Sequence, residues 1–457
     1  MRHVPSRGSL VLFVLFSAAA AAPNPSPAQE PPAEPMGIEA CVQEALRANP
    51  LLEAAGHGLL AAREAESAAR SAYLPRLDFQ AASRRFESRA FLPSALTGEA
   101  APAGGISPVI GPVNQHSLAM KGTYTLFDGG LRRAEAAHAA AGTWGALHAR
   151  EEARQKVVLS VHKAFYGALA AQESLGVAEK VLERALQHER MALARRETGD
   201  APLADVLRAR VRTSEARVAL LRASSDVSVA MGALNAAMGR PPQTPLSIRH
   251  DPRTPADAPL PSVGEALAAA LSERPELDGA VQRVEAGRRR VEAARSAFVP
   301  KVRLEGSYGR LDQGFFPGDR DWSLGIALAV PVFTGFARGH DLARARAELA
   351  RSESEALWVV LAVEQEAFAA LARAEESRAA VLAVRDLVRE AEESLRMARE
   401  RYAEGAGTIT DLLDAETGLS EARLREVRAV YEERMAAAEL RWATGRADGE
   451  TSGTGER

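Results

Sequence analysis

The sequence predicts a mainly α-helical protein with a β-barrel part, in which a unit made of a β-hairpin and a long helical hairpin occurs twice. Three observations lead to this prediction. Short sequence matches recur at a fixed offset, two proline-free stretches each run for about 67 residues, and four segments of about ten residues alternate apolar with polar side chains. Apolar residues make up 46% and charged residues 26% of the 457-residue chain, which is the composition of a folded protein.

The duplication is visible in matched segments of the two halves. The segment at 71–75 (SAYLP) matches the segment at 296–300 (SAFVP), 225 residues later. Phe127 matches Phe333, and the same offset of 206 residues holds as far as Gly445. An offset maintained over more than 100 residues indicates an internal repeat. We expect a first repeat at 29–240, a Pro-rich linker at 241–261, a second repeat at 262–446 and a disordered tail at 447–457.

The N-terminal segment has the pattern of a secretory signal peptide, predicted at 1–28. Arg2 and Arg7 precede an apolar run from Leu10 to Ala22, and small residues and prolines follow. A membrane anchor is the alternative, although the run is shorter than the roughly 20 residues of a spanning helix. The single cysteine, Cys41, excludes a disulfide framework and is expected to be a buried thiol rather than a lipidation site.

The helices of each repeat follow from proline placement and from long proline-free stretches. A short helix is expected at 38–48 and again at 263–272, and Pro50 and Pro275 suit the first turn of the next helix. A helix of 67 residues is about 100 Å long and cannot bury itself alone, so coiled-coil-like pairing is expected. The long helices are predicted at 131–198 and 337–404, with return helices at 203–238 and 408–444.

The alternating segments predict four β-strands with one apolar face each. The strands are expected at about 75–86, 116–127, 300–310 and 322–333, with a long loop inside the first pair and a shorter one inside the second. Ten residues is the length of a tilted membrane-spanning strand. Thirteen of the 23 aromatic residues lie in 73–127 and 298–336, as in the aromatic girdles of membrane barrels. A water-soluble β-hairpin domain is the alternative. Phe315, Phe316 and Trp322 are candidate membrane-interface anchors, with loop packing as the other interpretation.

Four strands do not close a barrel, and open sheet edges are not tolerated in hydrocarbon. Two chains would supply eight strands, which is the smallest closed barrel and has a filled interior. Three chains would supply twelve. A conducting barrel needs more than the minimum, so the physical argument favours three copies.

Two motifs carry a resemblance to a known family. One is the entry Phe127-Asp128-Gly129-Gly130 from strand to long helix, and the other is the helix-turn segment at 401–415 (RYAEGAGTITDLLDA). With the duplication, they resemble the TolC-like outer-membrane efflux factor family (outer membrane efflux proteins). The resemblance implies a homotrimer in the cell outer membrane, with a twelve-stranded transmembrane β-barrel on a long periplasmic α-helical barrel. It also implies a passive exit duct that works with a periplasmic adaptor protein and an inner-membrane transporter. A duct for type I protein secretion and a secreted non-membrane coiled-coil scaffold are the alternatives.

The resemblance also implies roles for residues at the turns of the helical hairpins. Acidic residues at the positions of Asp411 and Asp414 would ring the narrow entrance and favour cations. Acids in a first helical turn also simply complement the helix dipole. Asp205, the first-repeat counterpart of Asp411, is a further candidate constriction residue that would help to hold the closed tip. The family's basic latch residue corresponds to Gly407 here, so Arg401 or Arg208 is the candidate substitute. The candidate adaptor-docking tips are Thr198, Gly199, Gly405, Ala406 and Gly407, with a pair of solvated hairpin turns as the other interpretation.

Several function classes lack support in the sequence. No zinc-binding pair of histidines, phosphate-binding glycine loop or catalytic motif is present, so we predict no enzyme activity, no cofactor and no metal site. Basic and acidic residues nearly balance, at 57 against 60, which argues against nucleic acid as a partner. The expected partners are further copies of the chain, the adaptor, the transporter and outer-membrane lipid.

Overall fold

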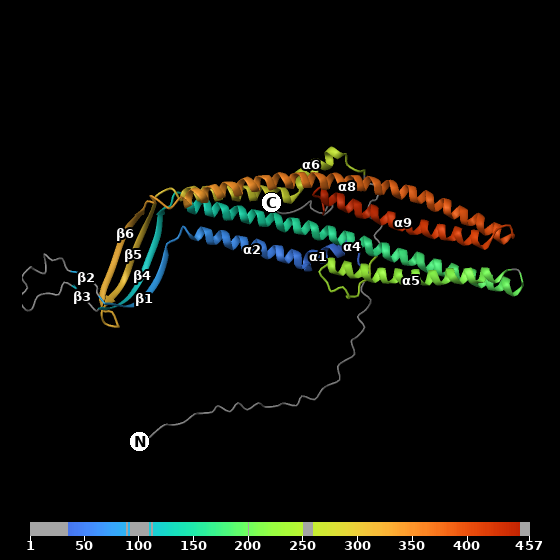
Figure 1. Cartoon of the computed structure of the whole chain (residues 1–457), viewed down its shortest axis with the longest axis horizontal. Coiled ribbons are helices and arrows are strands. Elements are labelled where there is room, and N and C mark those ends of the chain that lie inside the picture. Colours follow the sequence, from blue (N-terminus) through green and yellow to red (C-terminus); the bar gives the residue numbers. More distant parts are fainter. Residues whose placement is uncertain are drawn as a thin grey trace, which may run out of the picture.

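The computed structural model describes residues 35–87, 90–91, 109–110, 113–199, 201–249 and 259–447. The predicted signal peptide and residues 448–457 of the predicted tail lie outside these ranges. The described chain is elongated, with a β-sheet at one end and the turns of two helical hairpins at the other (Figure 1). Among the described helices, none combines the length and the apolar character needed to cross a membrane.

The first repeat runs from a pair of short helices through two strands into a long helical hairpin. Asn49 separates the short helices: its side chain accepts the Leu51 N–H, and Pro50 occupies the first helical turn, where a missing N–H costs nothing. The elements are α1 (Ile38–Ala48), α2 (Pro50–Ser71), β1 (Arg76–Phe86), β4 (Val113–Phe127), α4 (Leu131–Glu197) and α5 (Leu203–Ala237).

The second repeat has the same order of elements. Its first helix begins with a capping box, in which Ser262 and Glu265 each satisfy the other's backbone N–H. The elements are α6 (Val263–Glu273), α7 (Pro275–Ser296), β5 (Lys301–Asp312), β6 (Asp319–Ala329), α8 (Ala337–Ala403) and α9 (Ile409–Ala443).

The predicted bounds of β6 and the predicted loop before β4 need correction. β6 spans Asp319–Ala329 and not 322–333. Pro331 has no N–H to donate to the strand ladder, and the chain leaves the sheet before it. The loop expected between the first two strands also contains a short pair of its own, β2 (Ala90–Phe91) and β3 (Val109–Ile110).

The four long strands form one antiparallel sheet in the order β1-β4-β5-β6. Residues directly opposite each other share a face, so the register separates two faces. On one, Leu304 lies opposite Ile326 and Tyr308 opposite Trp322. We call this the apolar face, and its side chains are exposed in the single chain: Trp322, Leu324 and Ile326 are each about 70% exposed. The polar face carries residues such as Arg303, Glu305 and Ser307, and the Ser307 and Ser323 hydroxyls are 2.8 Å apart.

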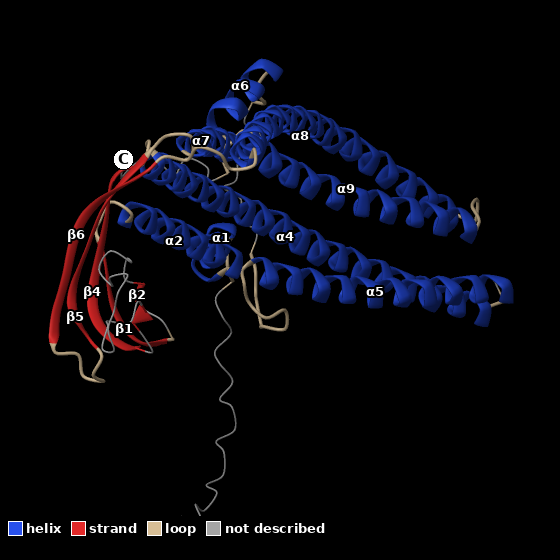
Figure 2. Ribbon diagram, turned by 60° about the vertical axis from the view of Figure 1, so that its left-hand side comes forward, coloured by secondary structure: helices blue, strands red, loops and turns tan. Residues whose placement is uncertain are grey.

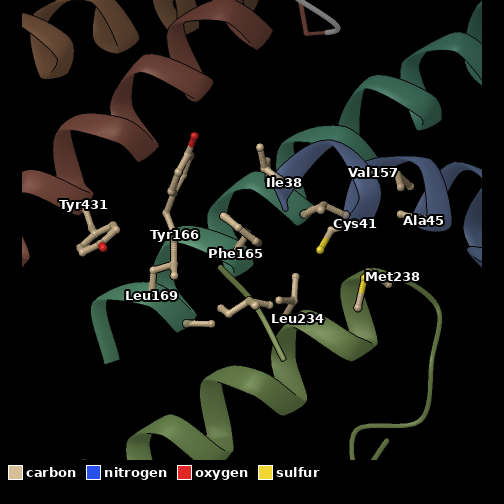
Figure 3. Packing of buried hydrophobic residues seen from close by; sticks show 13 residues of the cluster. Ile38, Cys41, Ala45, Val157, Phe165, Tyr166, Leu169, Leu234, Met238 and Tyr431 are labelled. Carbon is tan, nitrogen blue, oxygen red and sulfur yellow. The ribbon is translucent and has the colours of Figure 1, made fainter. Parts of the chain in front are cut away.

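The largest buried cluster lies midway along the helices, where α1 packs against α4 and α5 (Figure 3). Phe165 and Tyr166 of α4, Leu234 of α5, Met238 directly after α5, and Cys41 of α1 are each at most 2% exposed. Burial raises the pKa of the Cys41 thiol to about 11. This cluster joins the base of the first hairpin to α1, and Tyr431 brings α9 of the second hairpin into the same core.

Candidate functional site

The candidate site lies at the turns between α4 and α5 and between α8 and α9, which we call the hairpin tips. Each long helix ends at a glycine with a left-handed backbone, Gly199 at φ 87° and Gly405 at φ 75°. In the second tip, the N–H groups of Ala406 and Gly407 donate to the Arg401 carbonyl at 2.8 and 3.0 Å. These bonds satisfy a carbonyl that the helix end would otherwise leave unpaired, and they fix a tight turn. Both tips lie at the same end of the molecule (Figure 1).

Asp411 is held in a capping box at the start of α9. Its Oδ2 accepts the Thr408 N–H at 3.0 Å and the Thr408 hydroxyl at 2.8 Å, and its own N–H donates to Thr408 Oγ1. The bonds from Thr408, first from its backbone and then from its hydroxyl, lower the pKa of Asp411. The residue is exposed to solvent, so its negative charge is available at the tip.

The other two predicted acids have arginine partners. Asp205 pairs with Arg208 one turn later on the same helix at 3.2 Å. Asp414 is 68% exposed and faces Arg212 of α5 at 3.7 Å. Arg212 therefore spans the two hairpins, a role that the sequence did not indicate.

The remaining latch candidate, Arg401, is exposed and contributes a charge that favours ionised Asp411. Gly407 has little room for a side chain, because a Cβ there would lie 3.2 Å from both the Cβ of Arg401 and the backbone nitrogen of Tyr402. The absence of a long side chain at this position thus fits the tight turn. Thr198 uses its hydroxyl locally, donating to the Arg195 carbonyl at 3.0 Å.

A buried cluster just behind the turns holds the two hairpins together. It is made of side chains from α4, α5, α8 and α9, among them Val206, Leu395, Leu412 and Leu413. The Arg195 guanidinium of α4 lies over the Tyr402 ring of α8, 4.5 Å from its centroid. The tips therefore pack as one body rather than as two independent turns.

Glu416 is the centre of a polar contact within this body that sequence reasoning missed. Its Oε1 lies 2.8 Å from Nε2 of His188 on α4 and 3.0 Å from Nη2 of Arg399 on α8. The Glu416 and His188 side chains are only 11% and 9% exposed. Burial acts to raise the pKa of Glu416, but the hydrogen bonds and charges of His188 and Arg399 outweigh it and lower the pKa. One carboxylate thus joins three helices from both hairpins.

A groove lies beside these residues on the surface of the joined tips. It has a volume of about 440 Å³ and lies between α5 and α9. Its walls combine apolar and charged side chains: Leu207, Arg208, Val211, Arg212, Glu215, Thr410, Leu413 and Asp414. In the part of the chain that the structure describes, no group of three or more His, Cys, Asp or Glu side chains is arranged to hold a metal ion.

Comparisons with known proteins identify the family. The family model of the outer membrane efflux proteins matches residues 41–240 and 266–446. The chain belongs to this family. It is 29% identical over 340 residues to protein CyaE of Bordetella pertussis, covering 73% of this chain and 71% of that one. It is 28% identical over 327 residues to the outer membrane efflux protein BepC of Brucella suis, covering 70% of each. The crystal structure of the outer membrane protein VceC from Vibrio cholerae has a TM-score of 0.76 at 21% identity, covering 89% of this chain and 96% of that one.

Membership of the outer membrane efflux protein family confirms the predicted resemblance and the predicted fold class of long helices with a β part. The predicted outer-membrane efflux function and localisation are confirmed at the level of the family. The roles of individual tip residues stay predictions.

The predicted interface aromatics lie at the end of the sheet that is far from the helices. Phe315 and Phe316 are 73% and 85% exposed in the β5–β6 turn, and their rings meet edge to face. Phe315 also contacts the His116 ring. Trp322 lies on the apolar face opposite Tyr308.

Proposed function

We propose that the chain is one third of a homotrimeric duct that passively exports small molecules across the outer membrane. Three four-stranded sheets form a twelve-stranded barrel, and the helical hairpins form a tunnel that extends into the periplasm. An inner-membrane pump supplies the energy and a periplasmic adaptor connects pump and duct. The chain itself performs no chemical step.

One observation carries this proposal. The described sheet has an apolar face that is open to its surroundings, and β1 and β6 each have a partner on one side only. In hydrocarbon such edges must be paired, because each unsatisfied backbone group costs several kcal/mol. Pairing β6 of one copy with β1 of the next satisfies every edge when the ring closes.

The tip residues support a cation-favouring entrance. Around a threefold axis, Asp411 and Asp414 supply six carboxylates, and the hydrogen bonds from Thr408 lower the pKa of Asp411 and so favour its charged form. Arg212 neutralises Asp414 in part because the two lie 3.7 Å apart. Asp411 is therefore the stronger determinant of selectivity in this proposal.

Reversal potentials in planar bilayers test the entrance. The variant D411N/D414N keeps the shape of both side chains and an oxygen that can still cap the helix, so it removes charge alone. We expect lower cation selectivity than in the wild type. Asp386→Asn is the control, because Asp386 is exposed on α8 and, within the described residues, pairs locally with Arg389. Unchanged reversal potentials in D411N/D414N would refute the role of these acids.

The groove between α5 and α9 is the proposed adaptor-docking surface. It has apolar walls flanked by charges of both signs and lies directly beside the tips. Crosslinkers placed at Thr198 or Ala406 in living cells test it by naming the captured adaptor. Capture of an efflux adaptor supports small-molecule export, whereas capture of a type I secretion adaptor replaces it with protein export. If salt extracts the protein from membranes and the purified protein shows no channel conductance, the proposed duct is refuted.

A further inference from the structure

Two arginines end the apolar face of the sheet at the side far from the helices. Arg310 on β5 lies directly opposite Arg320 on β6, one step beyond the pair Tyr308 and Trp322. Arg85 lies near the far end of β1, on the same face as Leu77 and Phe79. All three arginines are exposed. We call Arg85, Arg310 and Arg320 the arginine rim, and Figure 2 shows the end of the sheet that carries it.

The positive charge of the rim is not neutralised within the described chain. Like charges directly opposite each other on neighbouring strands are destabilising, and Arg310 faces Arg320. Across the described residues, no carboxylate forms a salt bridge with any of the three arginines. Asp312 lies two residues beyond Arg310, but its oxygens accept the N–H groups of Gln313 and Gly318 at 2.6 and 3.3 Å. Among the described residues, the three guanidinium groups therefore remain free to bind a negatively charged hydrogen-bond acceptor from outside the chain.

The depth of the rim matches a lipid headgroup layer. Tyr308 and Trp322 have the place of an aromatic girdle at the edge of the apolar band. Two residues along a strand advance about 7 Å, or about 5 Å along the membrane normal for a strand tilted near 40°. The headgroup layer is about 5–7 Å thick on each side of the hydrocarbon. The guanidinium groups of Arg310 and Arg320 therefore lie among headgroups and not in the hydrocarbon.

The other arginines of the sheet behave differently. Arg303 lies on the polar face of β5 and has a carboxylate partner, Glu305, at 3.8 Å. Arg84 neighbours Arg85 but belongs to the polar face, opposite Gln115. At the end near the helices, the apolar face finishes with Val302 opposite Leu328 and carries no charge there. On the apolar face of the described sheet, the arginines are thus confined to the end far from the helices.

We propose that the arginine rim binds the phosphate groups of phosphorylated lipids in the membrane leaflet far from the helices. The inference rests on the proposed function, because it requires the sheet to form part of a membrane barrel. A guanidinium presents a planar fork of N–H donors that matches a phosphate and is only weakly hydrated. One phosphate between Arg310 and Arg320 turns their repulsion into two charge-assisted contacts. The ligand class is an anionic, phosphate-bearing lipid and not a free anion.

Lipid binding by the purified, delipidated full-length trimer tests the inference. The probes are lipid A with two phosphates and the same lipid with its phosphates removed, and native mass spectrometry measures the bound fraction. We expect the wild type to prefer the phosphorylated lipid. Each basic residue near a membrane surface contributes about a fivefold change in affinity, so R310Q/R320Q should bind about 25-fold more weakly. R84Q/R303Q removes the same charge from the polar face and should bind as the wild type does.

Any of three binding comparisons would overturn the inference: equal binding of both lipids by the wild type, a loss of less than threefold in R310Q/R320Q, or equal losses in the two double variants. Displacement of the lipid by millimolar inorganic phosphate would also overturn it, since that result indicates a free-anion site. The lipid comparison uses the wild type and does not depend on the folding of any variant. Conductance of the same samples separates the two proposals. Channels that conduct without phosphate preference refute only the rim, whereas absence of both trimer and conductance refutes the duct.

Discussion

The contact at Glu416 gives a quantitative prediction about the hairpin tips. Glu416→Ala removes the acceptor shared by His188 and Arg399, at distances of 2.8 and 3.0 Å. Hydrogen bonds to charged groups contribute about 1.5–3 kcal/mol each, and breaking a buried pair costs about 3–5 kcal/mol. Arg399 is half exposed, so water can replace much of the interaction that its guanidinium loses. A net loss of about 3 kcal/mol, mostly at buried His188, is the expected value.

Hydrogen exchange measured by mass spectrometry reports this loss locally. A loss of about 3 kcal/mol raises the population of locally opened molecules more than 100-fold. Peptides from the first turns of α9 and from the end of α4 around His188 should exchange faster by that factor. Glu421→Ala is the matched control, because Glu421 lies on the same helix, is 62% exposed and has only a 3.9 Å partner. Exchange within threefold of the wild type in Glu416→Ala would refute the idea that this carboxylate holds the hairpins together.

Three further predictions concern other parts of the molecule. Because the pKa of Glu416 is lowered in the folded protein, its charged form stabilises the tip above the ordinary carboxyl pKa, and this stabilisation is lost as the pH falls through the folded-state pKa. Protection of α9 from hydrogen exchange should therefore decrease below about pH 4.5 in the wild type. In Glu416→Gln it should not change with pH in this range. Arg274→Ala should lower the thermal unfolding temperature. The Arg274 side chain is only 2% exposed and lies 2.6 Å from Glu276 and 2.8 Å from Glu366, so its removal leaves both carboxylates without their partner, at a cost of about 3–5 kcal/mol. Cys41 should react with thiol reagents at pH 8 only after denaturation, because it is fully buried and its pKa is about 11; rapid labelling of the folded protein would contradict this.

Local patterns were sufficient for the elements of the fold because the physics behind them is local. The helix from Leu131 to Glu197 lies in a stretch without proline, and it ends before a glycine whose φ of 87° few other residues adopt. Strand alternation with period two indicated which side chains share a face. The end of β6 was misplaced because apolar alternation continues past Ala329, although Pro331 prevents further pairing.

The contacts that join the two hairpins were not predictable in the same way. Glu416 is one of 60 acidic residues, and nothing in its neighbourhood along the chain distinguishes it from the exposed ones. Its importance comes from the convergence of His188 and Arg399, which belong to helices that the sequence does not align with α9. The same holds for Arg212, which meets Asp414 across two hairpins. Periodicity shows which face of a helix is buried, but not which helix packs against it or how the two are aligned.

The two tips differ in a way that allows the repeat itself to serve as the control. α9 is preceded by Thr408, which forms a capping box with Asp411. α5 is preceded by Pro202, which provides no side-chain cap, although Asp205 is in place at the equivalent third position. A capping side chain contributes about 1 kcal/mol, which is about fivefold in local opening. The first turn of α5 should therefore exchange faster than that of α9 in the wild type. Pro202→Thr supplies the missing hydroxyl to α5 and should slow its exchange by about fivefold, while Thr408→Ala should accelerate α9 by a similar factor. If Pro202→Thr leaves α5 unchanged, pairing of Asp205 with Arg208 at 3.2 Å already holds that turn, and capping does not account for the asymmetry between the tips.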